Sequence, residues 1–123
     1  MKTIEEFKKE TFEHIMAIRE LCKQELTAIR DDFCKNEFVN LFVPNKPTSK
    51  YFCEYSVLTS GVKINGGHSL YKVRAVRYYF EENEWTVVGY EETGIYEEIC
   101  IKYMCADDMI KIVSLLKREL FNY

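Results

Sequence analysis

The stretch EYSVLTSGVKINGGHSLYKVRAVRY, Glu54 to Tyr78, decides the predicted fold. Two runs of strand-forming residues flank Asn65-Gly66-Gly67. Asn-Gly is the strongest short hairpin signal, because both residues tolerate the positive φ of a type I′ turn. Centring the turn on Asn65-Gly66 pairs Ile64 with Gly67 and places Glu54 opposite Arg77, Tyr55 opposite Val76 and Cys53 opposite Tyr78. An opposite-charge pair at this register supports it.

Two further turns extend this hairpin into a sheet. A turn at Glu82-Asn83 sets Phe80 opposite Trp85 and Tyr78 opposite Val87. A three-residue loop, Glu92-Thr93-Gly94 with the glycine in the left-handed region, sets Val87 opposite Ile99 and Trp85 opposite Ile101. One face then carries the predicted core residues Tyr55, Val57, Val76, Tyr78, Phe80, Trp85, Val87, Ile99 and Ile101.

A helical pattern precedes the sheet and another follows it. Thr3 and Glu6 form a capping-box pair, and apolar residues then recur every three or four positions from Ile4 to Phe33. If this helix continues to about Lys35 it is roughly 45–50 Å long, longer than the ~30–35 Å expected for a domain of this size. Either the helix breaks near Gln24 or a second subunit covers it. The last helix is predicted from about Asp107 to Phe121, with Asp107 or Asp108 as its N-cap.

These patterns predict a single α+β domain over residues 1–123: a four-stranded antiparallel meander in the order α-β-β-β-β-α, with its helices mainly on one face. The expected parts are a long N-terminal helix (1–36), a connector (44–50), the sheet (51–104) and a C-terminal helix (106–121). Residues 59–72 extend past the later strands, so this ribbon pairs only with itself. We expect the overshooting ribbon and helix to lie against each other or against a second copy.

The composition argues against several functional classes. The net charge of −3 is too small to indicate a nucleic-acid binder or a membrane-surface protein. No apolar run is long enough to span a bilayer, and residues 1–12 lack the apolar block of a signal peptide. Five cysteines, an odd number without C-x-x-C spacing, indicate reduced thiols and a cytoplasmic protein. We expect no cofactor and no metal site.

The outer face of the predicted sheet is the first candidate binding surface. Tyrosine and arginine are enriched at binding hot spots because they combine large rigid area with a polar tip. The alternative is an ordinary solvated face. The candidates are Arg77, Tyr79, Tyr90, Tyr96, Glu54 and Glu98, accompanied by Phe52, Tyr71, Val88, Cys100 and Lys102.

Two charged segments are further candidates. The stretch from Glu81 to Glu98 contains seven glutamates and no lysine or arginine, and Glu81, Glu82, Glu84, Glu91 and Glu92 are its candidate contacts for a basic partner. A solvated charged rim is the alternative. The ribbon tip gathers Lys63, Asn65 and His68, with Lys72 and Arg74 behind them, and direct nucleic-acid binding by so few cations is not expected.

The leading hypothesis is a non-enzymatic acidic interaction protein, a homodimer formed through the N-terminal helix. It would bind and inhibit a macromolecular partner with a basic surface, such as nucleic-acid-handling machinery, by analogy with phage inhibitors of host defence. The alternative is a module that holds an anionic or nucleotide-like ligand on the Tyr/Arg-rich face. An enzyme is the third hypothesis, with His68 or Glu98 as acid–base groups or a Cys–His pair that meets only in space.

Overall fold

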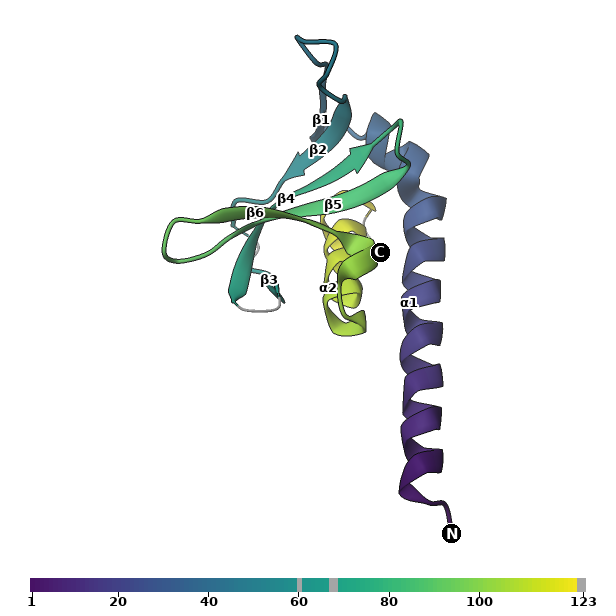
Figure 1. Cartoon of the computed structure of the whole chain (residues 1–123). Helices are drawn as coiled ribbons and strands as arrows, with labels where there is room; N and C mark the ends of the chain where they lie inside the picture. The colour runs from purple at the N-terminus through teal and green to yellow at the C-terminus, as the bar shows by residue number, and fades with distance from the viewer. Residues whose placement is uncertain (60, 67–68, 122–123) are drawn as a thin grey trace.

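The computed structural model describes residues 1–59, 61–66 and 69–121. The chain is α+β: in sequence order a long N-terminal helix is followed by an antiparallel sheet and then by a shorter C-terminal helix, which lies under the sheet beside the long one (Figure 1). The strands run in the order β1-β2-β4-β5-β6, and β3 pairs with β4 alone. Its elements are α1 (Ile4–Lys35), β1 (Val39–Phe42), β2 (Phe52–Ser56), β3 (Lys63–Asn65), β4 (Leu70–Tyr79), β5 (Glu84–Tyr90), β6 (Tyr96–Cys100), η1 (Ile101–Tyr103), α2 (Ala106–Leu116) and η2 (Lys117–Phe121).

The expected four-stranded meander is therefore too small, because the sheet has six strands. The additional β1 pairs with β2 at the edge, where Asn40 lies opposite Glu54. The additional β3 is the tip of the predicted ribbon, separated from β2 by residues 57–62.

Helix α1 is continuous over 32 residues, so the expected alternative of a break near Gln24 is wrong. Its interior contains neither glycine nor proline, and Glu5 and Glu6 suit the positive end of the helix dipole. Thr3 is the predicted N-cap, with its Oγ1 accepting a hydrogen bond from the Glu6 backbone N–H at 3.1 Å. At the other end the Asn36 amide donates to the Leu120 carbonyl and ties α1 to η2.

The predicted register of the central hairpin is confirmed where β2 meets β4, with Glu54 opposite Arg77 and Tyr55 opposite Val76. The predicted two-residue turn at Asn65-Gly66 is wrong. Asn65 pairs with Leu70 rather than flanking a two-residue turn, and neither Asn65 nor Gly66 has a positive φ. The turn of the ribbon therefore lies farther toward the C-terminus than predicted. Segment 57–62 contains more residues than the part of β4 opposite it, and this difference restores the predicted pairing between β2 and β4.

Gly66 has a packing role instead. A Cβ placed there would lie 2.2 Å from the Tyr71 ring, so the glycine allows the ribbon backbone to rest on that ring. Tyr71 was expected on the outer face but is buried. A β-bulge between Val73 and Ala75 reverses the alternation of β4, which places Tyr71 on the core side.

Of the two other predicted turns, the one before β6 is confirmed and the one before β5 is wrong. The loop before β6 is as predicted, because Gly94 has a φ of 98° and Val87 lies opposite Ile99. The turn before β5 is longer than predicted, so Tyr78 faces Trp85 and Val76 faces Val87. Asn83 supplies the left-handed residue there, with a φ of 52°. A two-residue shift leaves side chains on their original face, which preserves the predicted core.

All nine predicted core residues belong to the hydrophobic core or pack directly against it. Helix α2 lies under the sheet and supplies Met109, Ile112 and Leu116, each fully buried. The N-cap of α2 is Cys105, which makes no side-chain capping bond, so the expected aspartate cap is wrong.

Asp108 has a different role: it is buried, and its Oδ2 accepts a hydrogen bond from the Asn65 N–H at 3.0 Å. The ribbon therefore rests on α2 rather than on α1. None of the helices within the described ranges is long and apolar enough to cross a bilayer.

Candidate binding surfaces

The N-terminal half of α1 projects away from the rest of the chain (Figure 1). Its apolar side chains, which would be core in a packed helix, are open to solvent. Phe12 is 63% exposed and Ile4 73% exposed. The others are Phe7, Ile15, Met16, Ile18 and Leu21. Ile4, Phe7, Ile15 and Ile18 belong to the stripe expected from sequence, and Phe12, Met16 and Leu21 widen it.

The exposed apolar stripe of α1 continues, on the same face of the helix, into the buried residues of its C-terminal part, which are called the buried seam below. The stripe repeats every eleven residues, a period of 3.67 that keeps side chains on one face of a nearly straight helix. Only the final part packs on the sheet and α2: Cys22, Leu26, Ile29 and Phe33 are buried, and the Phe33 ring meets Trp85 edge-on. The three repeats are Ile4-Phe7-Thr11, Ile15-Ile18-Cys22 and Leu26-Ile29-Phe33.

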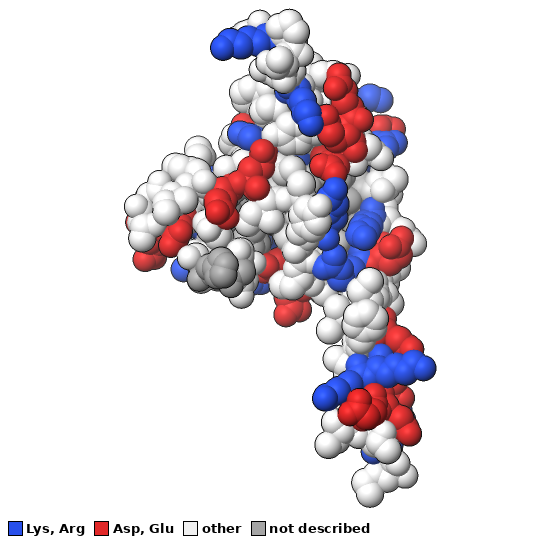
Figure 2. Space-filling model, in the orientation of Figure 1, with Lys and Arg blue, Asp and Glu red and all other residues white. Residues whose placement is uncertain are grey.

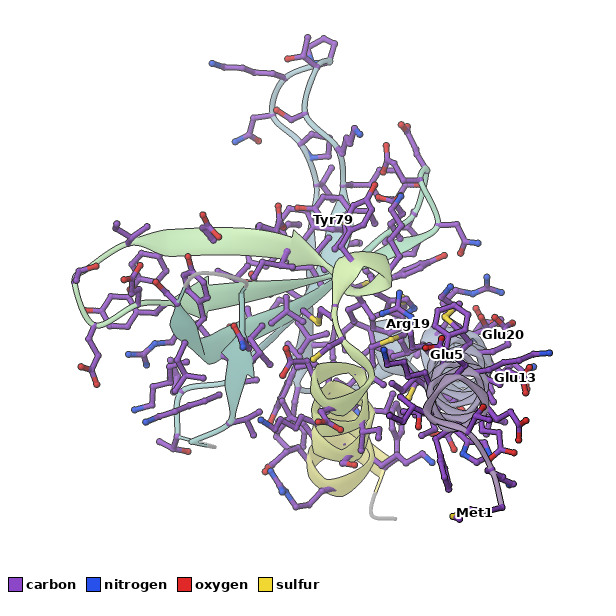
Figure 3. The ribbon with its side chains drawn as sticks, turned by 60° about the horizontal axis from the view of Figure 1, so that its bottom comes forward. Met1, Glu5, Glu13, Arg19, Glu20 and Tyr79 are labelled. Atoms are coloured by element: carbon purple, nitrogen blue, oxygen red, sulfur yellow. The ribbon has the colours of Figure 1, made fainter. Side chains whose placement is uncertain are left out.

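Arg19 marks the point where α1 leaves the body of the protein. Its guanidinium donates to the backbone carbonyls of Lys102, at 2.7 Å, and Met104. Figure 3, viewed nearly along α1, shows Arg19 pointing toward the rest of the chain and Glu13 and Glu20 pointing away. The helix is thus fastened from Arg19 onward, and a shallow, open groove between the side chains of Ile4, Phe7, Lys8, Thr11, Phe12 and Ile15 lies on its free part.

On the outer sheet face, Arg77 is the centre of a closed hydrogen-bonded network. Its Nε lies 2.7 Å from Glu54 Oε1, and its Nη1 lies 2.8 Å from Glu98 Oε1. The same Glu98 oxygen accepts from the Tyr79 hydroxyl at 2.5 Å and from Thr86 Oγ1 at 3.1 Å. This cluster of Glu54, Arg77, Tyr79, Thr86 and Glu98 is called the Arg77 network below.

The pKa values of Glu98 and Tyr79 are both shifted from their ordinary values, because the two side chains are partly buried and hydrogen-bonded to each other. Burial alone would raise the pKa of Glu98, but hydrogen bonds from Tyr79 and Arg77 outweigh it and lower that pKa. Burial and the bond to Glu98 raise the pKa of Tyr79 to about 12. Arg77 also packs on the Phe52 ring, 4.6 Å from its centroid. Arg77 is thus already engaged by side chains of its own sheet.

Two other predicted outer-face tyrosines lie on the same face, farther toward the β5–β6 loop. Tyr90 is opposite Tyr96, with ring centroids 4.9 Å apart, the next same-face cross-strand pair beyond Val88 and Glu98. The cation over Tyr90 is Arg74, whose guanidinium carbon lies 5.1 Å from the ring centroid. Sequence reasoning assigned Arg74 only to the ribbon, because the bulge that turns it has no local signature.

The acidic stretch is partly neutralised by cations from other segments. Lys50 pairs with Glu82 at 2.8 Å, Lys102 pairs with Glu84, and Arg77 pairs with Glu98. The Lys102 ammonium lowers the pKa of Glu84. Figure 2 shows lysine and arginine side chains interspersed with acidic ones on the face in view. Glu81, Glu92 and Glu97 are exposed, and Glu91 is half-buried and accepts a bond from Ser69.

The candidates for acid–base and thiol chemistry are the two histidines and the cysteines. His68, one of the predicted ribbon-tip residues, lies outside the described residues, whereas His14 is exposed on the free half of α1. Burial raises the pKa of Cys22, Cys53, Cys100 and Cys34, the last to about 12, which keeps these thiols protonated at neutral pH. Within the described ranges no three His, Cys, Asp or Glu side chains gather in a group suited to a metal ion.

Comparison of the chain with protein-family models, with curated proteins and with solved structures finds no match.

Proposed function

We propose that this chain is a non-enzymatic binding protein that assembles as a homodimer through the apolar side chains exposed on the N-terminal part of α1, residues 4–21. The observation that carries the proposal is the run of seven large apolar side chains, each 37–73% exposed, on one helix segment. A fully exposed large side chain presents roughly 150–200 Å², so the run amounts to about 550–750 Å² per chain. Contiguous apolar patches on monomers rarely exceed a few hundred Å².

A second copy of the chain fits this area. Two such patches facing each other would bury at most about 1,100–1,500 Å², close to the range of stable protein interfaces. The stripe continues the buried seam of α1, so an identical helix can extend the same mode of packing. The flanks carry charges of both signs, including Lys8, Lys9, Glu5 and Glu13, so they do not present a one-signed repulsive surface.

Such a dimer would present two copies of the β4–β5 and β5–β6 hairpins to a macromolecular partner with a basic surface. The carboxylates of Glu81, Glu92 and Glu97 support this role, because they are exposed and form no ion pair within the described residues. Occupying a basic surface would block nucleic acid from it, which is the inhibitory activity we propose. Glu82 and Glu84 contribute less, because lysines already pair with them.

The dimer is tested by light scattering of the full chain over a range of concentrations. We expect twice the chain mass for the wild type and the single-chain mass for Ile18→Asp, whose side chain is 37% exposed and lies outside the buried core. A wild-type chain that remains monomeric at high micromolar concentration would refute the assembly.

The partner surface is tested separately by affinity capture at rising salt. Wild type should retain a basic partner that Glu81→Gln/Glu92→Gln/Glu97→Gln does not, and salt should release it because exposed charges are screened over about 8–10 Å near physiological ionic strength. The matched control is Glu5→Gln/Glu6→Gln/Glu13→Gln, which removes three carboxylates from α1. Equal retention by wild type and both triple variants would eliminate the hairpins as the binding surface.

A further inference from the structure

A hollow of about 470 Å³ lies between the β3–β4 ribbon and the β5–β6 hairpin. This volume is within the range of small-molecule sites. Its wall combines three cationic side chains, Lys63, Lys72 and Arg74, with the ring of Tyr90 and, on the hairpin side, with Glu91 and Glu92. Ser69 Oγ donates to Glu91 Oε1 at 3.1 Å and ties the ribbon to the hairpin across it. The hollow is therefore a preformed space between two connected walls.

The two lysines occupy an unfavourable arrangement. Lys63 and Lys72 are direct cross-strand partners in the β3–β4 pair, and like charges in this position repel each other. A third ammonium, Lys111 Nζ, lies 3.0 Å from the Lys63 carbonyl oxygen and is balanced by Asp108 at 4.0 Å. In the described part of the chain, no ion pair balances Lys63 or Lys72. A bound anion would remove the repulsion.

Arg74 is the third cation of this wall. It occupies the β-bulge of β4, a feature that re-aims a side chain, and its guanidinium carbon lies 5.1 Å from the Tyr90 ring centroid. Its Nε is shielded from solvent, so a ligand in the hollow would bond to the terminal Nη atoms, and Arg74 forms no ion pair among the described residues. Arg77, three residues later, is by contrast bonded to both Glu54 and Glu98.

From these observations we infer that the hollow binds a small phosphate-bearing molecule of nucleotide size. Lys63, Lys72 and Arg74 would hold the phosphate, since Lys and Arg donors form strong charge-assisted bonds to phosphate oxygens. The Glu91 carboxylate, an acceptor at the border of the hollow, suits a ligand that also carries hydroxyl groups. The site lies on the ribbon rather than on α1, so it can exist whether or not the chain dimerises.

The test is a thermal-shift and amide-NMR titration of the full chain with inorganic phosphate, adenosine monophosphate and adenosine, at ionic strength matched with chloride. We expect both phosphate compounds to raise the Tm and to move ribbon resonances, and adenosine to do neither. Tighter binding of the monophosphate than of inorganic phosphate would identify a nucleotide-type ligand, and equal binding a site for phosphate alone. Lys72→Gln and Arg74→Gln should each weaken binding roughly tenfold or more, the loss expected for a charge-assisted bond.

Two variants separate this site from general charge effects. Lys46→Gln removes an exposed lysine from the 43–50 loop and should bind as the wild type does. Lys63→Gln should raise the Tm without phosphate, because it relieves the repulsion from Lys72, and should lose the rise that phosphate produces. The proposal is overturned by no response beyond the chloride control, or by the same response in wild type and in the Lys63 and Lys72 variants.

Discussion

Phe12, on the free half of α1, is expected to contribute strongly to the proposed dimer. Its side chain is 63% exposed in the single chain, which corresponds to roughly 120 Å² of mostly apolar surface. A symmetric dimer would cover two such rings, or about 240 Å². At ~25 cal/mol per Å² a complete covering contributes about 6 kcal/mol, and covering half of each ring contributes about 3 kcal/mol. Phe12→Ala should therefore weaken the dimer by at least about 100-fold in Kd.

The structure offers a matched control, because Phe38, just before β1, is also 63% exposed. Sedimentation equilibrium of both alanine variants should show a weaker dimer for Phe12→Ala and an unchanged dimer for Phe38→Ala. Alanine is the better helix former, so loss of α1 would not explain a weaker dimer. Below the dissociation constant, both variants should melt as the wild-type monomer does, within about 0.5 kcal/mol. Equal Kd values for the wild type and both variants would refute the packing of α1 on a second copy.

Two further predictions test the sheet. Asp108→Ala leaves the Asn65 N–H without its buried acceptor and should cost ~1–3 kcal/mol of unfolding free energy, measured by urea titration; an unchanged midpoint would show that the ribbon does not rest on α2. The lowered pKa of Glu98 stabilises the folded state above the pKa of the unfolded chain, and this contribution disappears as pH falls through the lower folded value. Glu98→Gln should therefore flatten the acid limb of the stability–pH curve, and an acid limb identical to that of the wild type would exclude Glu98 as its source.

The alternation of apolar residues along each strand predicted the core. It assigns each side chain to one face of the sheet without depending on how long the connecting turn is. That is why Tyr78, Trp85 and Val87 lie on the expected side although the turn before β5 was placed wrongly. The Asn65-Gly66 turn failed for a physical reason: the glycine allows close packing on the Tyr71 ring and has no positive φ. The register at Glu54 was nevertheless right, because the segment between β2 and β3 compensates.

The missed features depend on contacts between distant segments. β1 has only four residues, three of them exposed, so it lacks the buried alternation that identifies a strand. The pairing of Lys50 with Glu82 and of Lys102 with Glu84 cannot be read from a local charge run. The bulge at Arg74 likewise follows from how β4 meets β5. These contacts decide which cations of the predicted outer face and ribbon are already engaged.

The continuity of α1 also has a mechanical consequence. At 1.5 Å per residue, about 22 Å of helix precedes Arg19, and about 21 Å separates Arg19 from Phe33. The helix contains no hinge residue, Arg19 fastens it to two backbone carbonyls, and its buried residues pack from Cys22 to Phe33, so α1 is a rigid beam held at one end. A sideways load on the free end, from a bound partner or a second copy, falls first on the Arg19 hydrogen bonds and on the packing of Cys22 and Leu26.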